Sequence, residues 1–256
     1  MKWNNIIILV LSTQERSYQI FKNSIQKSWF KTAQNEGVKC YFYEGGHNTQ
    51  EISGNLIKLT AKDDLLNTSK KLVEVFELIR KKFPQVDIVY RTNLSSHIDV
   101  PALLKFIKKH NINLNSYVGI KGETYLLKEF FYLKNIFLHK LFSFIKLGHK
   151  IKFASGSGFF IGKKNIDKVI KRQNKMYLID DVMVGYNLDG KVNSNNIIRF
   201  DIKEDNSHKI LPDEFNQLLD NGLFHYRLKT SNRIYDSALL ASFSDKNNII
   251  KLCTFQ

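Results

Sequence analysis

The sequence predicts an α/β fold: a mixed, mostly parallel sheet flanked by helices, in a single domain. Two patterns predict it. Short apolar runs typical of buried strands alternate with longer segments in which apolar residues recur every three or four positions, as on one face of a helix. In addition, the 256 residues contain no repeat, low-complexity tract or composition break that would mark a linker between domains. The content of 43% hydrophobic and 25% charged residues is typical of a globular protein.

The first half of the chain has the order of βαβ units. Ile6–Leu11 is a continuous apolar run, as expected for a buried central strand. A helix with an apolar face is expected from about Ser17 to Asn35, followed by a strand at Val38–Tyr43. A second helix covers about Asp64–Phe83, and a short buried strand follows at Asp87–Arg91. Strands connected by helices in this way predict parallel pairing with crossover connections.

The second half is less regular, with an asparagine-rich tail beyond residue 191. Its expected elements are, in chain order, a helix at Val100–His110, a strand at Tyr117–Ile120, a glycine-rich turn at Ser155–Gly158, a strand at Phe159–Ile161, a helix at about Lys164–Gln173, a helix from near Asp180, and an apolar-basic run at Leu223–Leu228.

The charge balance favours anionic partners. The chain has 39 Lys and Arg against 24 Asp and Glu, a formal net charge of +15, which suits nucleic acid, acidic lipid or a phosphorylated substrate. Leu126–Leu147 combines aromatic and aliphatic residues with lysines spaced six apart. Such a segment either lies in a membrane interface as a peripheral contact or packs as a helical hairpin over the substrate site.

Targeting signals are not expected. No segment reaches the roughly 18–20 apolar residues of a membrane span, and the apolar run Ile6–Leu11 is too short for a signal peptide. The two cysteines, Cys40 and Cys253, cannot form a disulfide scaffold. We therefore expect a cytoplasmic protein without a transmembrane anchor.

Polar loops at the strand ends are the candidate site. Open α/β sheets bind ligands beyond the carboxyl ends of their strands, and this places Ser12–Arg16, Arg91–His97 and Ser155–Gly158 together. The glycines of Ser155–Gly158 either let the backbone approach a sugar or phosphate or simply form a tight turn. The segment has neither the Walker nor the dinucleotide-binding glycine spacing.

Two further motifs each have two interpretations. In Ile179-Asp180-Asp181-Val182, with Gly185 beyond, the carboxylates either cap a helix or point toward the cleft. In Phe224–Lys229, alternation puts the side chains of three cationic or imidazole residues on one face of an extended segment. That face either binds a diphosphate through charge-assisted hydrogen bonds or belongs to a solvated edge strand.

Together these motifs resemble one family, the fringe-like β-1,3-galactosyl- and N-acetylglucosaminyltransferases of the GT-A fold. The resemblance covers roughly residues 6–230 in the family's order and spacing. The segments that carry it are Ser24-Ile25-Gln26-Lys27-Ser28-Trp29 (similar to Ala-Ile-Arg-x-Thr-Trp), Asp63–Leu72 (through Asn67, Ser69 and Lys71), Ala154–Ile161 (similar to Ser-Gly-x-Gly-Tyr-x-x-Ser), Ile179–Gly185 (similar to Glu/Asp-Asp-Val-x-x-Gly) and the late His225.

The resemblance implies an inverting glycosyltransferase with a nucleotide-sugar half at about residues 1–120. Residues 121–256 would form the acceptor half and a tail that closes over the diphosphate. Asp181 would be the general base, with a uridine-diphosphate (UDP) sugar as donor and a glycan as acceptor. The expected acceptor contacts are Asp180, Ser155, Gly156 and Gly158. The expected nucleotide-sugar contacts are Thr13, Arg16, Arg91, Asn93, Ser95, His225, Arg227, Lys229 and Arg233.

One departure from the family concerns the metal. Where the family has Asp-x-Asp, this chain has Asn93-Leu94-Ser95, whose neutral oxygens hold Mg²⁺ or Mn²⁺ poorly. Only His225 and Asp99 remain nearby, and they would form at most a weak metal site. We therefore expect no certain cofactor, and expect tail cations such as Arg227 to stabilise the diphosphate instead.

The alternative function is a basic module without catalysis, binding an anionic membrane surface or nucleic acid. The net charge and the missing carboxylate pair favour it. No helix-turn-helix or RNA-recognition motif is present, so nucleic acid is not an expected partner. Binding of a nucleotide sugar discriminates between the two functions.

Overall fold

The computed structural model describes residues 5–126, 128–129, 148–172, 178–191, 193–194, 199–202, 220, 222–230 and 232–242. The strands of the main sheet lie side by side in the order β3 (Glu51–Ser53), β4 (Leu56–Lys58), β2 (Lys39–Glu44), β1 (Ile6–Leu11), β5 (Ile88–Asn93), β8 (Lys150–Gly162), β7 (Tyr117–Tyr125) and β9 (Asn193–Ser194). A second sheet has the order β10 (Arg199–Ile202), β11 (His225–Leu228) and β6 (Ser96–Ile98).

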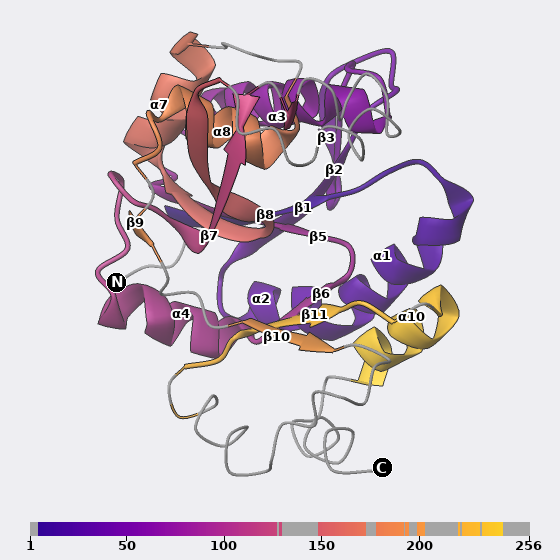
Figure 1. Cartoon of the computed structure of the whole chain (residues 1–256). Coiled ribbons are helices and arrows are strands. Elements are labelled where there is room, and N and C mark those ends of the chain that lie inside the picture. Colours follow the sequence, from indigo (N-terminus) through magenta and orange to yellow (C-terminus); the bar gives the residue numbers. More distant parts are fainter. Residues whose placement is uncertain are drawn as a thin grey trace.

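The helices cover both faces of the main sheet (Figure 1). On one face lie α3 (Thr68–Lys82), α7 (Lys163–Arg172) and α8 (Asp180–Asn187), and one hydrophobic core fills the space beneath them. A second core lies on the other face, under α1 (Gln19–Ile25), α2 (Lys31–Asn35), α4 (Val100–Lys109), α10 (Arg233–Ser242) and the three-stranded sheet. The structure therefore confirms the predicted α/β architecture, in which apolar strands are buried from both sides.

The centre of the sheet is parallel and one side is antiparallel. β1 pairs in parallel with β2 and with β5, whereas β8 pairs antiparallel with both β5 and β7. The predicted mixed sheet is thus confirmed. Leu11 at the end of β1 lies beside Asn93 at the end of β5, so the loops that follow these two strands emerge at the same edge.

The predicted helix from Ser17 to Asn35 is confirmed as a nearly continuous helical run with a local irregularity. The run consists of η2 (Arg16–Tyr18), α1, the π-turn η3 (Gln26–Phe30) and α2. Within η3, Ser28 departs from helical geometry, and its hydroxyl donates to the carbonyl of Ser24 at 2.7 Å. Similarly, a short η4 (Leu65–Asn67) precedes α3.

The predicted glycine-rich turn at Ser155–Gly158 is wrong, because these residues lie inside the long strand β8. Gly158 pairs with Thr92 in the sheet. A Cβ atom at Gly158 would lie 2.3 Å from the hydroxyl of Tyr90, so glycine is present here because a buried side chain occupies the space, not because the chain turns.

The apolar-basic run near the C-terminus is not a solvated edge strand. It forms β11, the central strand of the second sheet, parallel to β10 and antiparallel to β6. The indole nitrogen of Trp29 donates to the carbonyl of Ser96 at 3.2 Å and so joins β6 to the helical run. The second sheet thereby places residues from the tail next to the end of β5.

No helix in the described part of the chain is long and apolar enough to cross a bilayer.

Candidate active site

A cleft of about 480 Å³ lies at the edge where β1 and β5 end. This is the position at which open α/β sheets bind ligands. Its lining comes from the end of β1 and the following loop, from the segment before α3, from the β5–β6 turn, and from the tail. The lining residues are Leu11, Ser12, Thr13, Glu15, Tyr18, Asp63, Asp64, Leu65, Thr68, Lys71, Asn93, Leu94, Ser95, Arg227 and Arg233.

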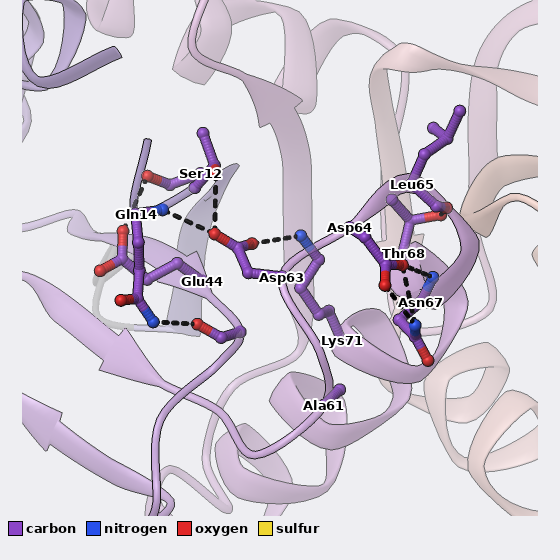
Figure 2. A network of polar contacts seen from close by, with 12 residues as sticks. Ser12, Gln14, Glu44, Ala61, Asp63, Asp64, Leu65, Asn67, Thr68 and Lys71 are labelled. Atoms are coloured by element: carbon purple, nitrogen blue, oxygen red, sulfur yellow. Dashed lines mark hydrogen bonds and ion pairs between the residues drawn. The ribbon is translucent and has the colours of Figure 1, made fainter. Parts of the chain in front are cut away.

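A hydrogen-bond network centred on Asp63 holds the loop after β1 (Figure 2). The carboxylate of Asp63 accepts from the Thr13 hydroxyl at 2.7 Å, the Gln14 backbone N–H at 2.6 Å and the Lys71 ammonium at 2.8 Å. Partial burial acts to raise the pKa of Asp63, but the hydrogen bonds from Lys71, Gln14 and Thr13 outweigh it and lower the pKa below its usual value. Asp63 therefore stays ionised and fixes this wall of the cleft.

The neighbouring carboxylate, Asp64, is also committed. It accepts from the backbone N–H of Asn67 at 2.9 Å and from its side-chain amide at 2.8 and 2.9 Å, at the start of η4 (Figure 2). Both acidic side chains at this end of the cleft thus support the backbone and already have donors bonded to them.

The opposite wall carries excess positive charge. Arg227 reaches the cleft from β11, and its Nε atom is buried without a hydrogen-bond partner among the described residues. Burial and the nearby charge of Arg199 lower the pKa of Arg227. Arg199 is paired with Asp201 at 2.6 Å, and Arg233 is paired with Asp236 at 3.2 Å. A buried, unsatisfied guanidinium nitrogen beside a second arginine favours an anion in the cleft.

Arg91 lies behind the cleft, below the two adjacent aspartates. It is 2% exposed, its Nη2 donates to the buried carboxylate of Asp180, and its Nε donates to the Tyr43 hydroxyl at 3.2 Å. Burial disfavours the charged form, but Asp180 and Tyr43 offset this and raise the pKa of Arg91 above its ordinary value. The two side chains neutralise each other in the interior. The nucleotide-sugar contact of Arg91 and the acceptor contact of Asp180 stay predictions.

Asp181 has a different environment. Its Oδ2 accepts from the backbone N–H of Gly156 at 2.6 Å, and its Oδ1 accepts from the N–H of Val182 at 2.9 Å. Burial and the negative charge of Asp180 raise the pKa of Asp181 to about 7, although Gly156, Arg91 and Val182 act to lower it. A carboxyl group with this pKa exchanges a proton readily at neutral pH, as general acid–base catalysis requires.

The capping interpretation of the two aspartates is not supported. The N-cap residue of α8 is Ile179, and no side-chain hydrogen bond caps this helix. The hydroxyl of Ser69 in α3 instead donates to the carbonyl of Leu178, which fixes the start of α8. The carboxylate of Asp180 is instead paired with Arg91, and that of Asp181 is hydrogen-bonded to the backbone of Gly156.

His225 is an interior residue. It is fully buried, its Nδ1 lies 2.8 Å from the Tyr90 hydroxyl, and its Nε2 lies 2.8 Å from the Ser96 hydroxyl. Burial, with the charges of Arg199 and Arg227, lowers the pKa of His225 to about 3, so the ring is neutral. Both ring nitrogens have partners inside the protein. The expected roles of His225 as a nucleotide-sugar contact and as a weak metal ligand stay predictions.

The residues near the end of β5 do not fit a hard divalent cation. The side-chain carbonyl of Asn93 accepts from the hydroxyls of Ser95 at 2.9 Å and Ser96 at 3.0 Å. Asp99 caps α4 by accepting from Ala102 N–H at 3.0 Å. Among the described residues, no group of three His, Cys, Asp or Glu side chains could hold a metal ion. Magnesium and manganese prefer carboxylates, which are missing here.

Five of the nine predicted nucleotide-sugar residues line the cleft, namely Thr13, Asn93, Ser95, Arg227 and Arg233. Outside its lining lie Arg16, exposed in η2, and Lys229, paired with Asp201 at 2.9 Å. Of the predicted acceptor residues, Gly156 contacts Asp181, and Ser155 lies 3.0 Å from the Ser157 hydroxyl.

Sequence reasoning gave no role to Asp63 or Arg199. Asp63 begins the family-like segment Asp63–Leu72, which also contains its partner Lys71. Arg199 donates to Ser157 of β8, and nothing in the sequence near either residue indicates this contact.

Two other regions bear on the predictions. The segment proposed to contact a membrane, 126–147, lies outside the described residues except at 126, 128 and 129. A second hollow of about 530 Å³ lies at the other end of α8. There Lys150 is paired with Glu123 at 2.6 Å and Arg172 with Asp189 at 2.8 Å. These two cations are compensated, whereas Nε of Arg227 in the cleft at the strand ends has no hydrogen-bond partner among the described residues, so that cleft is the stronger candidate.

Comparison with protein families gives one match. The family model described as "Galactosyltransferase" matches residues 22–197. This range includes the end of β5, the glycine-containing part of β8 and both aspartates. Among curated proteins, none matches the sequence significantly.

Two solved structures resemble this one over most of the chain. A glycosyltransferase involved in the glycosylation of the major capsid of PBCV-1 is 9% identical, with 92% of this chain and 98% of that chain covered and a TM-score of 0.49. The apo structure of the WbbM bifunctional glycosyltransferase is 10% identical, with 98% and 52% covered and a TM-score of 0.46.

Proposed function

The chain belongs to the galactosyltransferase family and is a glycosyltransferase, and on this premise we propose the reaction. A hexose or N-acetylhexosamine moves from a UDP-sugar to a sugar hydroxyl of a glycan acceptor, with inversion at the anomeric carbon. Membership of an enzyme family overturns the alternative of a non-catalytic basic module. The observation that carries the proposal is the cleft between the Asp63 loop and Arg227. Asp181 does not line this cleft, and it is hydrogen-bonded to Gly156 of β8.

The donor diphosphate binds at the positive wall. Arg227 has a buried nitrogen without a partner among the described residues, so a phosphate oxygen there would satisfy it. A hydrogen bond between charged groups contributes about 1.5–3 kcal/mol, equivalent to roughly 10- to 150-fold in affinity. The nucleoside then extends along the wall formed by Thr13 and the Asp63 segment, which the network in Figure 2 holds in place.

Asp181 acts as the general base. Its carboxylate removes the proton from the acceptor hydroxyl as that oxygen forms a bond to the anomeric carbon. The bond between this carbon and the diphosphate oxygen breaks, and the nucleoside diphosphate leaves. The pKa of about 7 suits this role, because the group is basic enough to take the proton and is partly ionised at neutral pH.

A metal ion is not required for donor binding in this proposal. The carboxylates that would hold it are absent at Asn93 and Ser95, and Asp99 caps a helix. Charge on the leaving diphosphate is stabilised instead by Arg227, with Arg233 at the same wall. Stabilisation of this kind is a large part of catalysis when the donors are held in advance.

The test is calorimetric titration of UDP and a panel of UDP-sugars, with Mn²⁺ and with excess chelator. The proposal predicts binding in both conditions, with affinities that differ by less than about tenfold, or about 1.4 kcal/mol. Arg227→Ala should weaken UDP binding by at least about tenfold, and raising the salt concentration should weaken it further. The matched control is Arg16→Ala, which removes an exposed arginine outside the cleft lining and should bind UDP like the wild type.

The outcomes are distinct. Absence of UDP and UDP-sugar binding would refute the donor site. Binding that appears only with Mn²⁺ would refute the arginine-based diphosphate site. It would not contradict the assignment of the protein as a glycosyltransferase. Equal losses in Arg16→Ala and Arg227→Ala would show that general surface charge, rather than the half-buried guanidinium of Arg227, attracts the nucleotide.

A further inference from the structure

The strongest feature not used by the proposed reaction is a buried cation beneath the catalytic carboxylate. Arg91 is almost wholly enclosed, and its guanidinium nitrogens are directed at Asp180 and at the backbone around Gly156. A Cβ atom built on Gly156 would lie 3.0 Å from Asp181 Oδ2 and 3.1 Å from Arg91 Nη1. The proposed base and the buried cation therefore converge on the same glycine.

We propose that Arg91 and Asp180 form a buried pair that positions Asp181 and sets its charge. The inference rests on the proposed function, because it assigns a role to two residues that support the base. Neither is a catalytic residue, since Asp180 contacts Arg91 and Arg91 lies behind the cleft. Their action on the reaction passes through Asp181.

The geometry explains how the pair positions the base. Arg91 comes from β5, Asp180 from the first turn of α8, and Tyr43, whose hydroxyl accepts from Arg91 at 3.2 Å, from β2. The ion pair thus attaches the start of α8 to two neighbouring strands. Asp181 is the next residue in the same turn, and Gly156 of β8 bonds its carboxylate from the side. These contacts leave its carboxylate little freedom.

The two partners shift the pKa of Asp181 in opposite directions. Asp180 raises the pKa of Asp181, and Arg91 lowers it. Removing the positive partner should therefore make Asp181 harder to ionise, whereas neutralising the negative partner should make it easier. A pair with a purely structural role would not produce opposite shifts.

Other ionisable groups near α8 are neutral or already paired, so we assign the expected shifts in the pKa of Asp181 to Arg91 and Asp180. Tyr117 of β7 is buried, and burial raises its pKa well above the ordinary value, so it stays neutral. On the elements packed against α8, Lys71 of α3 is paired with Asp63, Arg172 of α7 with Asp189, and Lys150 of β8 with Glu123.

The experiment measures how kcat depends on pH in Arg91→Met, Asp180→Asn and Arg91→Lys, with donor affinity measured in parallel. Activity should rise with pH as Asp181 loses its proton. We expect the midpoint of this rise to move up by at least about one pH unit in Arg91→Met and down by a similar amount in Asp180→Asn. Arg91→Lys keeps the charge and should stay near the wild-type midpoint. UDP affinity should stay within about threefold in all three variants.

A matched control is Arg80→Met, which removes an arginine paired with Asp167 away from the site and should leave the midpoint unchanged. Should Arg91→Met fail to fold, Asp180→Asn and Arg91→Lys still test the sign of the effect. Midpoints that do not move, or that move in the same direction in Arg91→Met and Asp180→Asn, would overturn the inference. So would a loss of UDP affinity in Arg91→Met with kcat unchanged, because that would make Arg91 a donor contact.

A measurement without turnover separates this inference from the proposed function. The carboxyl carbon of Asp181 can be titrated by ¹³C NMR in the same variants. Opposite shifts without any sugar transfer would support the pair and refute the reaction. Transfer with unshifted titrations would support the reaction and refute the pair.

Discussion

Replacing Gly185 by alanine should separate α8 from β8 and disable the site from a distance. A Cβ atom at Gly185 would lie 2.4 Å from the carbonyl oxygen of Lys152 and 2.5 Å from Cβ of Phe153. Neither atom is the end of a flexible side chain, so the helix must move outward by roughly 1 Å to reach ordinary van der Waals contact.

The magnitude follows from two opposing effects. Overpacking of a well-packed contact costs about 1–3 kcal/mol, whereas alanine in place of glycine inside a helix contributes about 1 kcal/mol. Because both clashes involve backbone or Cβ atoms of β8, the cost should lie near the upper end. The expected net loss in the free energy of unfolding is about 1–2 kcal/mol.

The effect on activity should exceed the effect on stability. Asp181 lies one helical turn before Gly185, and its 2.6 Å hydrogen bond to Gly156 crosses the interface that the methyl group opens. A displacement of about 1 Å at a reacting group can reduce the rate by about 100-fold. Urea unfolding measures the first quantity, and kcat for sugar transfer measures the second.

The control is Gly54→Ala on the turn between β3 and β4. Gly54 has φ +57°, and a Cβ atom added to it would meet no other atom within 4 Å, so alanine there costs about 1–2 kcal/mol of backbone strain without a clash. Its activity should match the wild type. If Gly185→Ala retained wild-type stability and turnover, the close packing of α8 on β8 would not be what positions the base.

Three further predictions concern the cleft and the core. Asp63→Asn should lower the free energy of unfolding by about 1–3 kcal/mol and weaken UDP binding, because it leaves Lys71 buried without its carboxylate; Asp64→Asn is the control, with a loss of about 1 kcal/mol or less. The free energy of unfolding should fall as pH drops from about 6.5 toward 4. Burial lowers the pKa of His225 to about 3 and that of His97 to about 4, so both rings stay neutral in the folded protein. The same histidines in the unfolded chain take up protons over this range, which favours unfolding. His225→Gln should reduce the steepness of that fall; an unchanged steepness in urea titrations at several pH values would mean that the imidazole is not buried and neutral.

The sequence predicted the elements with a strong apolar pattern. Ile6–Leu11 has no polar residue, and its burial between two helical layers follows directly from that composition. The amphipathic helices were also predictable from their periodicity. The loop after β1 could be assigned to the site because parallel strands that pair in register, as Leu11 and Asn93 do, end at the same edge.

The remaining parts depend on long-range contacts that leave no local pattern. Arg91 ends the predicted buried strand, a position typical of the start of a ligand-binding loop, but β5 continues for two more residues. Its partner Asp180 is 89 residues away, so periodicity could not reveal the pair. Similarly, the glycines of Ser155–Gly158 suggested a turn, yet they accommodate neighbouring side chains within a strand. In both places tertiary contacts, rather than local sequence propensity, determine the structure.

The most direct test of the central claim compares sugar transfer and donor affinity in the wild type and in Asp181→Asn. Release of UDP from UDP-galactose and other UDP-sugars is measured with a panel of glycan acceptors, and UDP binding is measured by calorimetry. The account predicts that Asp181→Asn loses at least about 100-fold in kcat, while UDP affinity stays within about threefold. Wild-type turnover in this variant would contradict the assignment of Asp181 as the base, and a parallel loss of UDP affinity would place Asp181 in the donor site instead.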